Sequence, residues 1–116
     1  MEFYILVDRT PVLVNMEMWA EWFTETDRRR VCKTKIGDST EVSTVFLGID
    51  HNYSRDGPPI LFETMIFGGP LDGDMWRCAT YSQAEAQHQA AVALATKADQ
   101  RCTELAEMAG AKRSGE

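Results

Sequence analysis

The chain has 116 residues, 44% of them hydrophobic, and a formal net charge of −6. A chain of this length can build one hydrophobic core and is too short for two. The acidic balance argues against a general nucleic-acid binder, which would carry a basic face, so no direct contact with nucleic acid is expected. It leaves open a basic partner, or one local cationic pocket for a small anion.

Three cysteines lie far apart in the sequence, at Cys32, Cys78 and Cys102. An odd, sparse set without a C-x-x-C pair predicts reduced thiols and no structural zinc site, and no cofactor is expected. The N-terminus is typical of a strand rather than a signal peptide, and the apolar runs are far shorter than the roughly 20 residues that span a bilayer. These features predict a cytoplasmic protein without a membrane partner.

The first elements are a hairpin and a helix. Two β-rich runs, Tyr4–Val7 and Pro11–Val14, flank a short turn. Asn15 is then a predicted helix N-cap, and the helix is expected to end near Asp27. Its apolar face follows the i, i+3, i+4, i+7 spacing of Met16, Trp19, Ala20 and Phe23.

The middle of the chain has the period and the turn signals of strands. The expected strands are Val31–Ile36, Glu41–Ile49, Ile60–Phe67 and Met75–Thr80, in a meander with hairpin connections. Both faces of the second strand are apolar around Phe46, which predicts a central strand covered on both sides.

The last element is a long alanine-rich helix. Ser82 and Glu85 form a predicted capping box, and Gly110 is the expected stop. Together these patterns predict an α+β fold in a single domain, 1–110, with a flexible tail, 111–116. The expected architecture is an antiparallel meander sheet of about four to six short strands, one helix in the N-terminal half and one long C-terminal helix.

The bend after the central strand is the first candidate site. Adjacent Asp50 and His51 could act in acid–base chemistry, since histidine titrates near neutrality. The alternative is a polar turn in which Asp50 accepts hydrogen bonds from backbone N–H groups. Glu63, the one charge in an apolar strand, is either a ligand-facing carboxylate or a member of an internal ion pair with Arg77 or one of the arginines 28–30.

The second candidate is the dense cationic run Arg28, Arg29 and Arg30. Guanidinium groups suit phosphate or carboxylate recognition, and the alternative is a solvated helix end. Tyr53 and Arg55 could join these arginines in a ligand pocket at an oligomer interface. His88, on the small-residue face of the last helix, is expected to be a hydrogen-bonded core or interface histidine rather than a metal ligand.

Two stretches carry a resemblance to a known group of proteins. They are Val42–His51, VSTVFLGIDH, and Pro58–Gly69, PPILFETMIFGG. Together with the Thr10–Pro11 hairpin, Trp19–Ala20 and the AEA-x-H stretch at 84–88, they resemble a small family of bacteriophage and prophage proteins over most of the chain. The polar tail after Ala98 is longer than in that pattern.

The resemblance implies a protein made in an infected bacterium that acts by binding, as a homo-oligomer in the host cytoplasm. The first hypothesis is a protein that counters antiviral defence by sequestering a nucleotide-derived immune signal. The second is an inhibitor that binds a host nuclease or another defence protein through an acidic surface. The third is a small hydrolase that uses Asp50, His51 and Glu63, although no G-x-S-x-G motif accompanies them.

Overall fold

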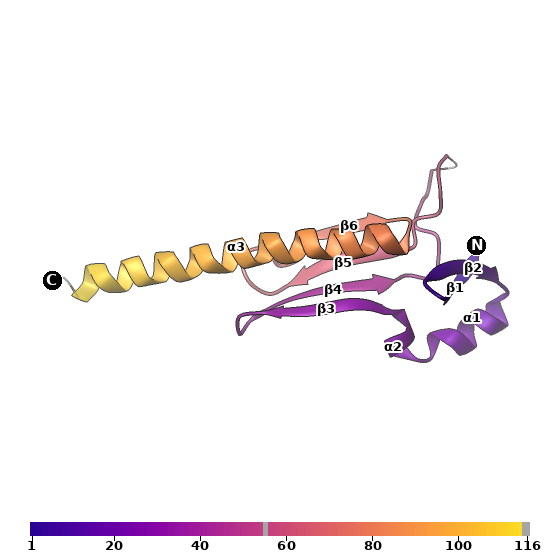
Figure 1. The fold of residues 1–116 in the computed structure, drawn as a ribbon, viewed down its shortest axis with the longest axis horizontal. Coiled ribbons are helices and arrows are strands. Elements are labelled where there is room, and N and C mark those ends of the chain that lie inside the picture. The colour runs from indigo at the N-terminus through magenta and orange to yellow at the C-terminus, as the bar shows by residue number, and fades with distance from the viewer. Residues whose placement is uncertain (55, 115–116) are drawn as a thin grey trace.

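The computed structural model describes residues 1–54 and 56–114 and confirms the predicted α+β class (Figure 1). Six strands form two antiparallel sheets, and one long helix follows them. In chain order the elements are β1 (Phe3–Val7), β2 (Thr10–Val14), α1 (Met16–Phe23), α2 (Thr26–Arg29), β3 (Arg30–Ile36), β4 (Thr40–Phe46), β5 (Phe62–Phe67), β6 (Met75–Cys78) and α3 (Tyr81–Ser114).

The predicted N-terminal hairpin is present as the two-stranded sheet β1–β2. Asp8 and Arg9 both have positive φ angles, 48° and 66°, as a two-residue turn of type I′ requires. A bridge between Phe3 and Ile49 joins β1 to the chain that follows β4, and the Tyr4 N–H donates to the Gly48 carbonyl at 2.8 Å. The hairpin is therefore anchored to the end of the main sheet.

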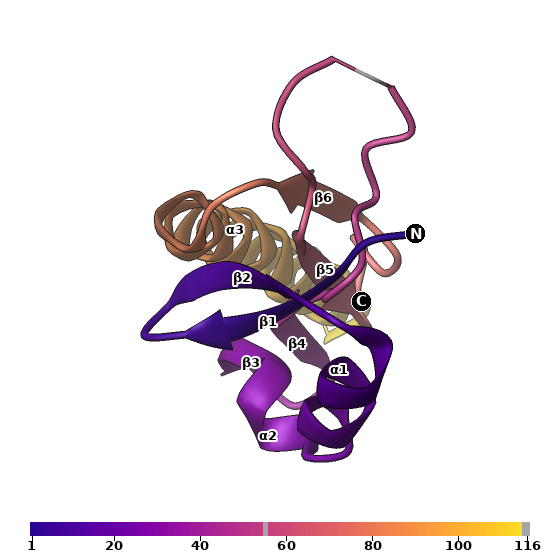
Figure 2. The same cartoon turned by 90° about the vertical axis from the view of Figure 1, so that its right-hand side faces the viewer.

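The larger sheet is a meander in the order β3-β4-β5-β6, as expected from the hairpin signals. All three strand pairs are antiparallel. Because side chains alternate along a strand, every second residue points to the same face. We call the face that packs against α3 the inner face and the opposite face the outer face. Figure 2 shows α3 beside the sheet, and the segment that links β4 to β5 extends away from the domain.

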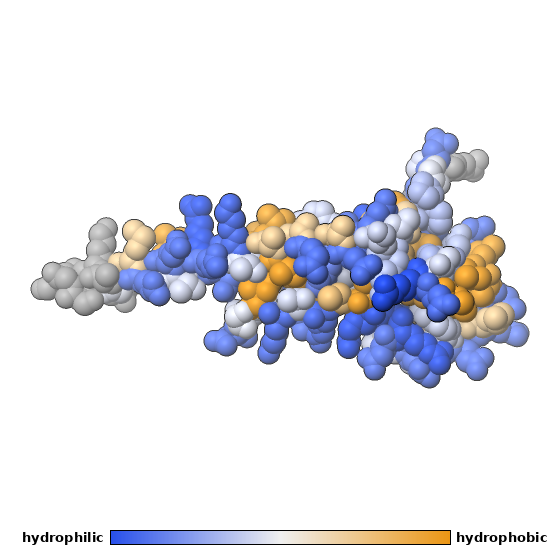
Figure 3. All heavy atoms as spheres, in the orientation of Figure 1, coloured by the Kyte–Doolittle hydropathy of each residue, from blue (hydrophilic) through white to orange (hydrophobic). Residues whose placement is uncertain are grey.

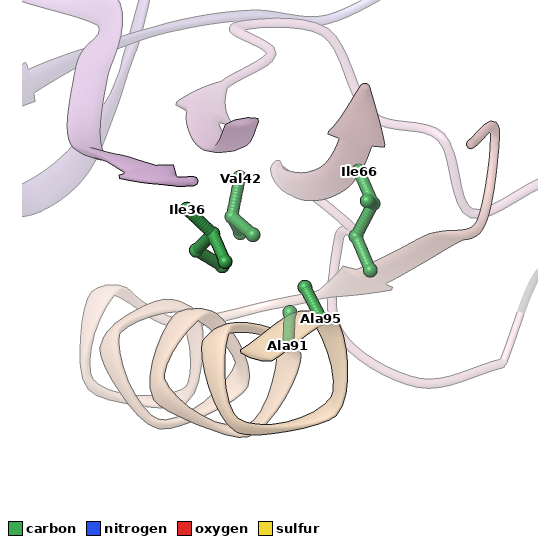
Figure 4. Close-up of a cluster of buried hydrophobic side chains, with 5 residues drawn as sticks. All are labelled: Ile36, Val42, Ile66, Ala91 and Ala95. Carbon is green, nitrogen blue, oxygen red and sulfur yellow. The ribbon is translucent and has the colours of Figure 1, made fainter. Parts of the chain in front are cut away.

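Aliphatic side chains of the inner face pack on the small residues of α3. Ile36, Val42 and Ile66 contact Ala91 and Ala95, and all five are buried (Figure 4). Alanine lets the helix backbone come close to the sheet, so β-branched side chains fill the space between them. A second cluster at the other end contains Phe46, Leu61, Phe62 and Ala84. The inner face and α3 thus form the core of the domain in two clusters.

A hydrogen-bonded histidine lies between the two clusters, as predicted for His88. Its Nε2 lies 2.8 Å from Thr34 Oγ1 and its Nδ1 lies 2.8 Å from Thr44 Oγ1. Thr44 Oγ1 lies 2.7 Å from Thr64 Oγ1 on the neighbouring strand. His88 is 1% exposed, and burial lowers the pKa of its imidazole. Each ring nitrogen has a partner, which offsets the cost of burying a polar group here.

The first predicted helix is wrong in its end and in part of its face. Asn15 is the N-cap, since its side chain accepts a hydrogen bond from the Met18 N–H at 2.9 Å. The helix ends at Phe23 instead of near Asp27, and the chain then forms the separate short helix α2. Met16 is 62% exposed, because the aromatic rings of α1 take the place against the sheet.

The ends of α3 also differ from the prediction. The helix begins at Tyr81, and Thr80 is the cap: its hydroxyl accepts from the Gln83 N–H, and Gln83 Oε1 accepts from the Thr80 N–H, both at 3.1 Å. A reciprocal pair of this kind is a capping box, shifted two residues from the expected Ser82. The helix continues through Gly110 to Ser114, so the predicted stop is wrong. The predicted tail, 111–116, starts inside this helix, and residues 115–116 lie outside the described part.

The outer face is partly exposed, whereas the apolar pattern around Phe46 predicted a central strand covered on both sides. Val42, Thr44 and Phe46 are buried on the inner face of β4, whereas Ser43 and Val45 on its outer face are only half-buried. Phe67 at the end of β5 is 46% exposed. Because α1 and α2 cover only the β3–β4 end of this face, it remains accessible to another molecule.

Candidate functional site

A hollow of about 320 Å³ lies between the α1–α2 segment and the outer face of the sheet. We call it the α2 groove. Its volume is near the lower end of the range for small-molecule sites, roughly 300–1,000 Å³. The residues that define its chemistry are Phe23 from α1, Arg29 from α2, Arg30 and Lys33 from β3, and Glu41 and Ser43 from β4.

A β-bulge at the start of β3 brings two cations to the same face. The register pairs Arg30 with Val45 and Lys33 with Ser43, with an irregularity between Arg30 and Cys32. Strict alternation would place residues 30 and 33 on opposite faces, and an extra residue reverses the alternation. The bulge therefore turns Arg30 to the outer face together with Lys33.

Arg29 is the member of the arginine run that is available to a ligand. Its guanidinium carbon lies 4.8 Å from the centroid of the Phe23 ring, and its Nε is buried without a hydrogen-bond partner among the described residues. Arg28 pairs with Glu25 at 2.9 Å, and Arg30 pairs with Asp27 at 3.4 Å, each within a single turn. A guanidinium over an aromatic ring, with its Nε unpaired, is suited to a planar or branched anion.

The opposite wall of the α2 groove adds polar groups. Lys33 Nζ lies 3.3 Å from Glu41 Oε1, and both side chains are partly exposed. Ser43 presents a hydroxyl between them and the aromatic end of the groove. Three cations and one carboxylate line the groove, and the carboxylate is already paired, so its field favours a negative ligand.

Close packing at Gly48 fixes the aromatic wall of the groove. Gly48 has a φ of 74°, and a Cβ there would lie 2.2 Å from Phe23 Cε2. Only glycine lets the Phe23 ring approach this backbone. Trp19 stacks on Phe23 with ring centroids 4.6 Å apart, and Phe3 contacts Trp19 in turn. The Phe23 ring beneath Arg29 is therefore held in place by the backbone at Gly48 and by the rings of Trp19 and Phe3.

The bend at Asp50 and His51 has mainly structural bonds. Asp50 Oδ1 accepts from the Asn52 N–H at 2.7 Å and the Ile60 N–H at 2.8 Å, which closes the loop between β4 and β5. His51 Nδ1 lies 2.8 Å from the Ile49 carbonyl, which can only accept, so Nδ1 carries the proton. Asp50 thus accepts hydrogen bonds from backbone N–H groups, as the turn interpretation of this motif proposed.

A second hollow, of about 360 Å³, borders this bend. Met1, Glu2, Ile49, Asp50 and Tyr53 line it. The carboxylates of Glu2 and Asp50 give it a negative field, opposite to that of the α2 groove. Burial, together with a 2.9 Å hydrogen bond to Glu2, raises the pKa of nearby Tyr4 to about 12. We call it the acidic hollow.

Glu63 has the partner that the sequence suggested. Its carboxylate accepts from Arg77 Nε at 3.0 Å across the β5–β6 pair. The Glu63 side chain is 17% exposed and lies on the outer face of the sheet. Its charge is therefore engaged in an ion pair between neighbouring strands.

The structure separates the predicted site residues. Arg29 and Arg30 line the α2 groove, Arg28 borders a different hollow beside Ile5 and Met18, and Asp50 and Tyr53 border the acidic hollow. The predicted ligand residue Arg55 lies outside the described residues. Sequence reasoning missed Phe23, Lys33, Glu41 and Ser43. The 37–40 turn could have indicated the pairing of Lys33 with Ser43, since it fixes the hairpin register.

The described residues lack two further features. None of the described helices is both long and apolar enough to cross a membrane. In the same part of the chain, no three His, Cys, Asp or Glu side chains come together as metal ligands. No known protein family, curated protein or solved structure matches the chain. The two hollows are therefore the features of the molecule that bear on its function.

Proposed function

We propose that the protein binds a small anionic ligand of the nucleotide class in the α2 groove. The observation that carries the proposal is Arg29, whose buried Nε is unpartnered while its guanidinium lies on the Phe23 ring. Lys33 and Arg30 supply further positive charge, and the half-buried outer face supplies apolar area for a base or ribose. Phosphate oxygens would accept from the guanidinium, as charge-assisted hydrogen bonds.

The biological role that fits this chemistry is sequestration of a nucleotide-derived immune signal by a phage-encoded protein. Support for the phage origin is the sequence resemblance at 42–51 and 58–69. A binding role is favoured over catalysis because Asp50 and Glu63, two of the candidate catalytic residues, already have structural partners. The hydrolase that would use Asp50, His51 and Glu63 has no support from this geometry.

Calorimetric titration with cyclic dinucleotides and with a cyclic ADP-ribose tests the proposal. Arg29→Ala should lower the affinity for whichever probe binds by at least about tenfold, since a hydrogen bond to a charged group contributes roughly 1.5–3 kcal/mol. Arg28→Ala is the matched control, because it removes the same charge from the neighbouring residue outside the groove. Absence of heat with every probe, or equal weakening by both variants, would overturn the proposal.

The acidic hollow favours a second candidate, a contact with a basic host protein such as a nuclease. Tyr53 is 85% exposed beside the carboxylates of Glu2 and Asp50. Tyrosine is enriched at protein interfaces, where the ring supplies contact area. If this is the function, Tyr53→Ala should abolish inhibition of a purified host nuclease and Arg29→Ala should leave it unchanged.

A further inference from the structure

The C-terminal end of α3 is exposed. The buried residues of this helix, Ala84, His88, Ala91 and Ala95, all lie in its first half, and every residue from 100 to 110 is exposed. We call this exposed end of α3 the projecting half. Figure 1 shows this yellow end of α3 running past the turn between β3 and β4. The sheet anchors the first half of α3, so the projecting half can continue the helix without a new nucleation step, and its exposed side chains can contact another molecule.

One side of the projecting half has a hollowed, mixed surface. Six residues at helical spacing line a shallow hollow of about 460 Å³: Lys97, Gln100, Arg101, Glu104, Leu105 and Met108. We call this surface the distal face. Leu105 is 55% exposed and Met108 67% exposed, and Figure 3 shows apolar side chains among charged ones on this end of the helix. Leu105 and Met108 are three residues apart, so they lie on the same side of the helix and form one small exposed apolar patch beside the hollow.

The charges of the distal face identify its occupant. Lys97 and Arg101 lie toward its N-terminal end, and the carboxylate of Glu104 follows them. A second copy of the helix in the same direction would set like charges opposite each other. A copy in the reverse direction sets Glu104 opposite Lys97 and Arg101 of the first copy, twice by symmetry. We infer that the distal face pairs with the distal face of a second copy of this chain in an antiparallel homodimer.

The rest of the fold accommodates this pairing. Successive helical residues are rotated by about 100°, which puts the distal face and the sheet-facing residues on different sides of α3. The helix of the second copy therefore does not displace the sheet that packs on α3. The four-stranded sheets of the two copies lie at opposite ends of the helix pair. Leu105 and Met108 of each copy enter the hollow of the other. A two-fold pairing of one patch with itself is the commonest form of homodimer.

Charge exchange tests both the surface and the direction. Multi-angle light scattering under reducing conditions, chosen because Cys102 is exposed, should give twice the 13.1 kDa chain mass. Arg101→Glu and Glu104→Arg should each weaken the dimer at least about tenfold. An equimolar mixture of the two variants should restore it, because each like-charge pair becomes an opposite-charge pair in the mixed antiparallel dimer.

Glu107→Arg is the matched control, since Glu107 is exposed and lies outside the distal face. It should keep the parental mass. Far-UV circular dichroism verifies that each variant is folded. A monomer at all soluble concentrations would overturn the inference, and so would a dimer that Arg101→Glu leaves intact or a mixture that stays monomeric.

Discussion

The two faces of the four-stranded sheet differ in what they contribute. The inner face combines fully buried aliphatic and aromatic side chains with a satisfied histidine–threonine network. The outer face alternates charges with half-exposed apolar side chains and borders the α2 groove. The same three strand pairings build both faces, so the faces differ in the elements that pack on them. Stability is therefore concentrated on one side of the sheet and ligand chemistry on the other.

Phenylalanine truncation on each face gives the largest expected contrast. Phe62 on the inner face is 0% exposed and Phe67 on the outer face is 46% exposed, although both lie on β5. Phe62→Ala should lower the free energy of unfolding by about 3–5 kcal/mol, because it leaves a cavity. Phe67→Ala should cost less than about 1 kcal/mol. Urea denaturation measures both values, and similar costs would show that the faces are equally packed.

The buried histidine gives the inner face a pH dependence. Burial lowers the pKa of His88, so the unfolded chain takes up a proton as pH falls through about 6.5 while the folded chain resists it. The unfolding free energy should be constant above that pH and fall below it, by at most about 1.4 kcal/mol per pH unit.

Denaturation series between neutral and mildly acidic pH test this dependence. His88→Gln should flatten the loss of stability relative to the parent protein. His51→Gln, at the other histidine of the chain, should retain it. A slope that disappears only in His51→Gln would assign the effect to the bend instead.

The outer-face ion pair should have the smallest effect. Arg77 is 35% exposed and Glu63 17%, so solvent screens their attraction. A double-mutant cycle with Glu63→Gln and Arg77→Gln should give a coupling energy of about 0.2–1 kcal/mol that shrinks at high salt. A coupling above this range that salt does not change would mean that the outer face is covered in solution.

Much of the fold follows from local signals that the sequence carries in full. Asn15, the 37–40 turn and the alanine run before Ala98 act over a few residues, so they predicted the first helix cap, the central hairpin and α3. Long-range packing decides what they missed. The helix α1 ends at Phe23, whose ring packs on Gly48, and no local pattern encodes that long-range contact.

The candidate site was predicted only in part for the same reason. Arg29 and Arg30 stand out in the sequence as part of a cationic run. What distinguishes the three arginines is the carboxylate that each one reaches, since Arg28 pairs with Glu25 and Arg30 with Asp27. The bulge that turns Arg30 to the outer face has no sequence signature in this strand. Glu63 and Asp50 stood out as charges in apolar surroundings, and both have structural partners.

The sequential order of the strands has a consequence during synthesis. All three pairings of the larger sheet join neighbours along the chain, so they can form before α3 leaves the ribosome. Until then the inner face is bare, and Thr34, Thr44 and Thr64 interrupt its apolar surface. Hydroxyls that later hold His88 would meanwhile be hydrated, which reduces the tendency of nascent chains to stick to one another.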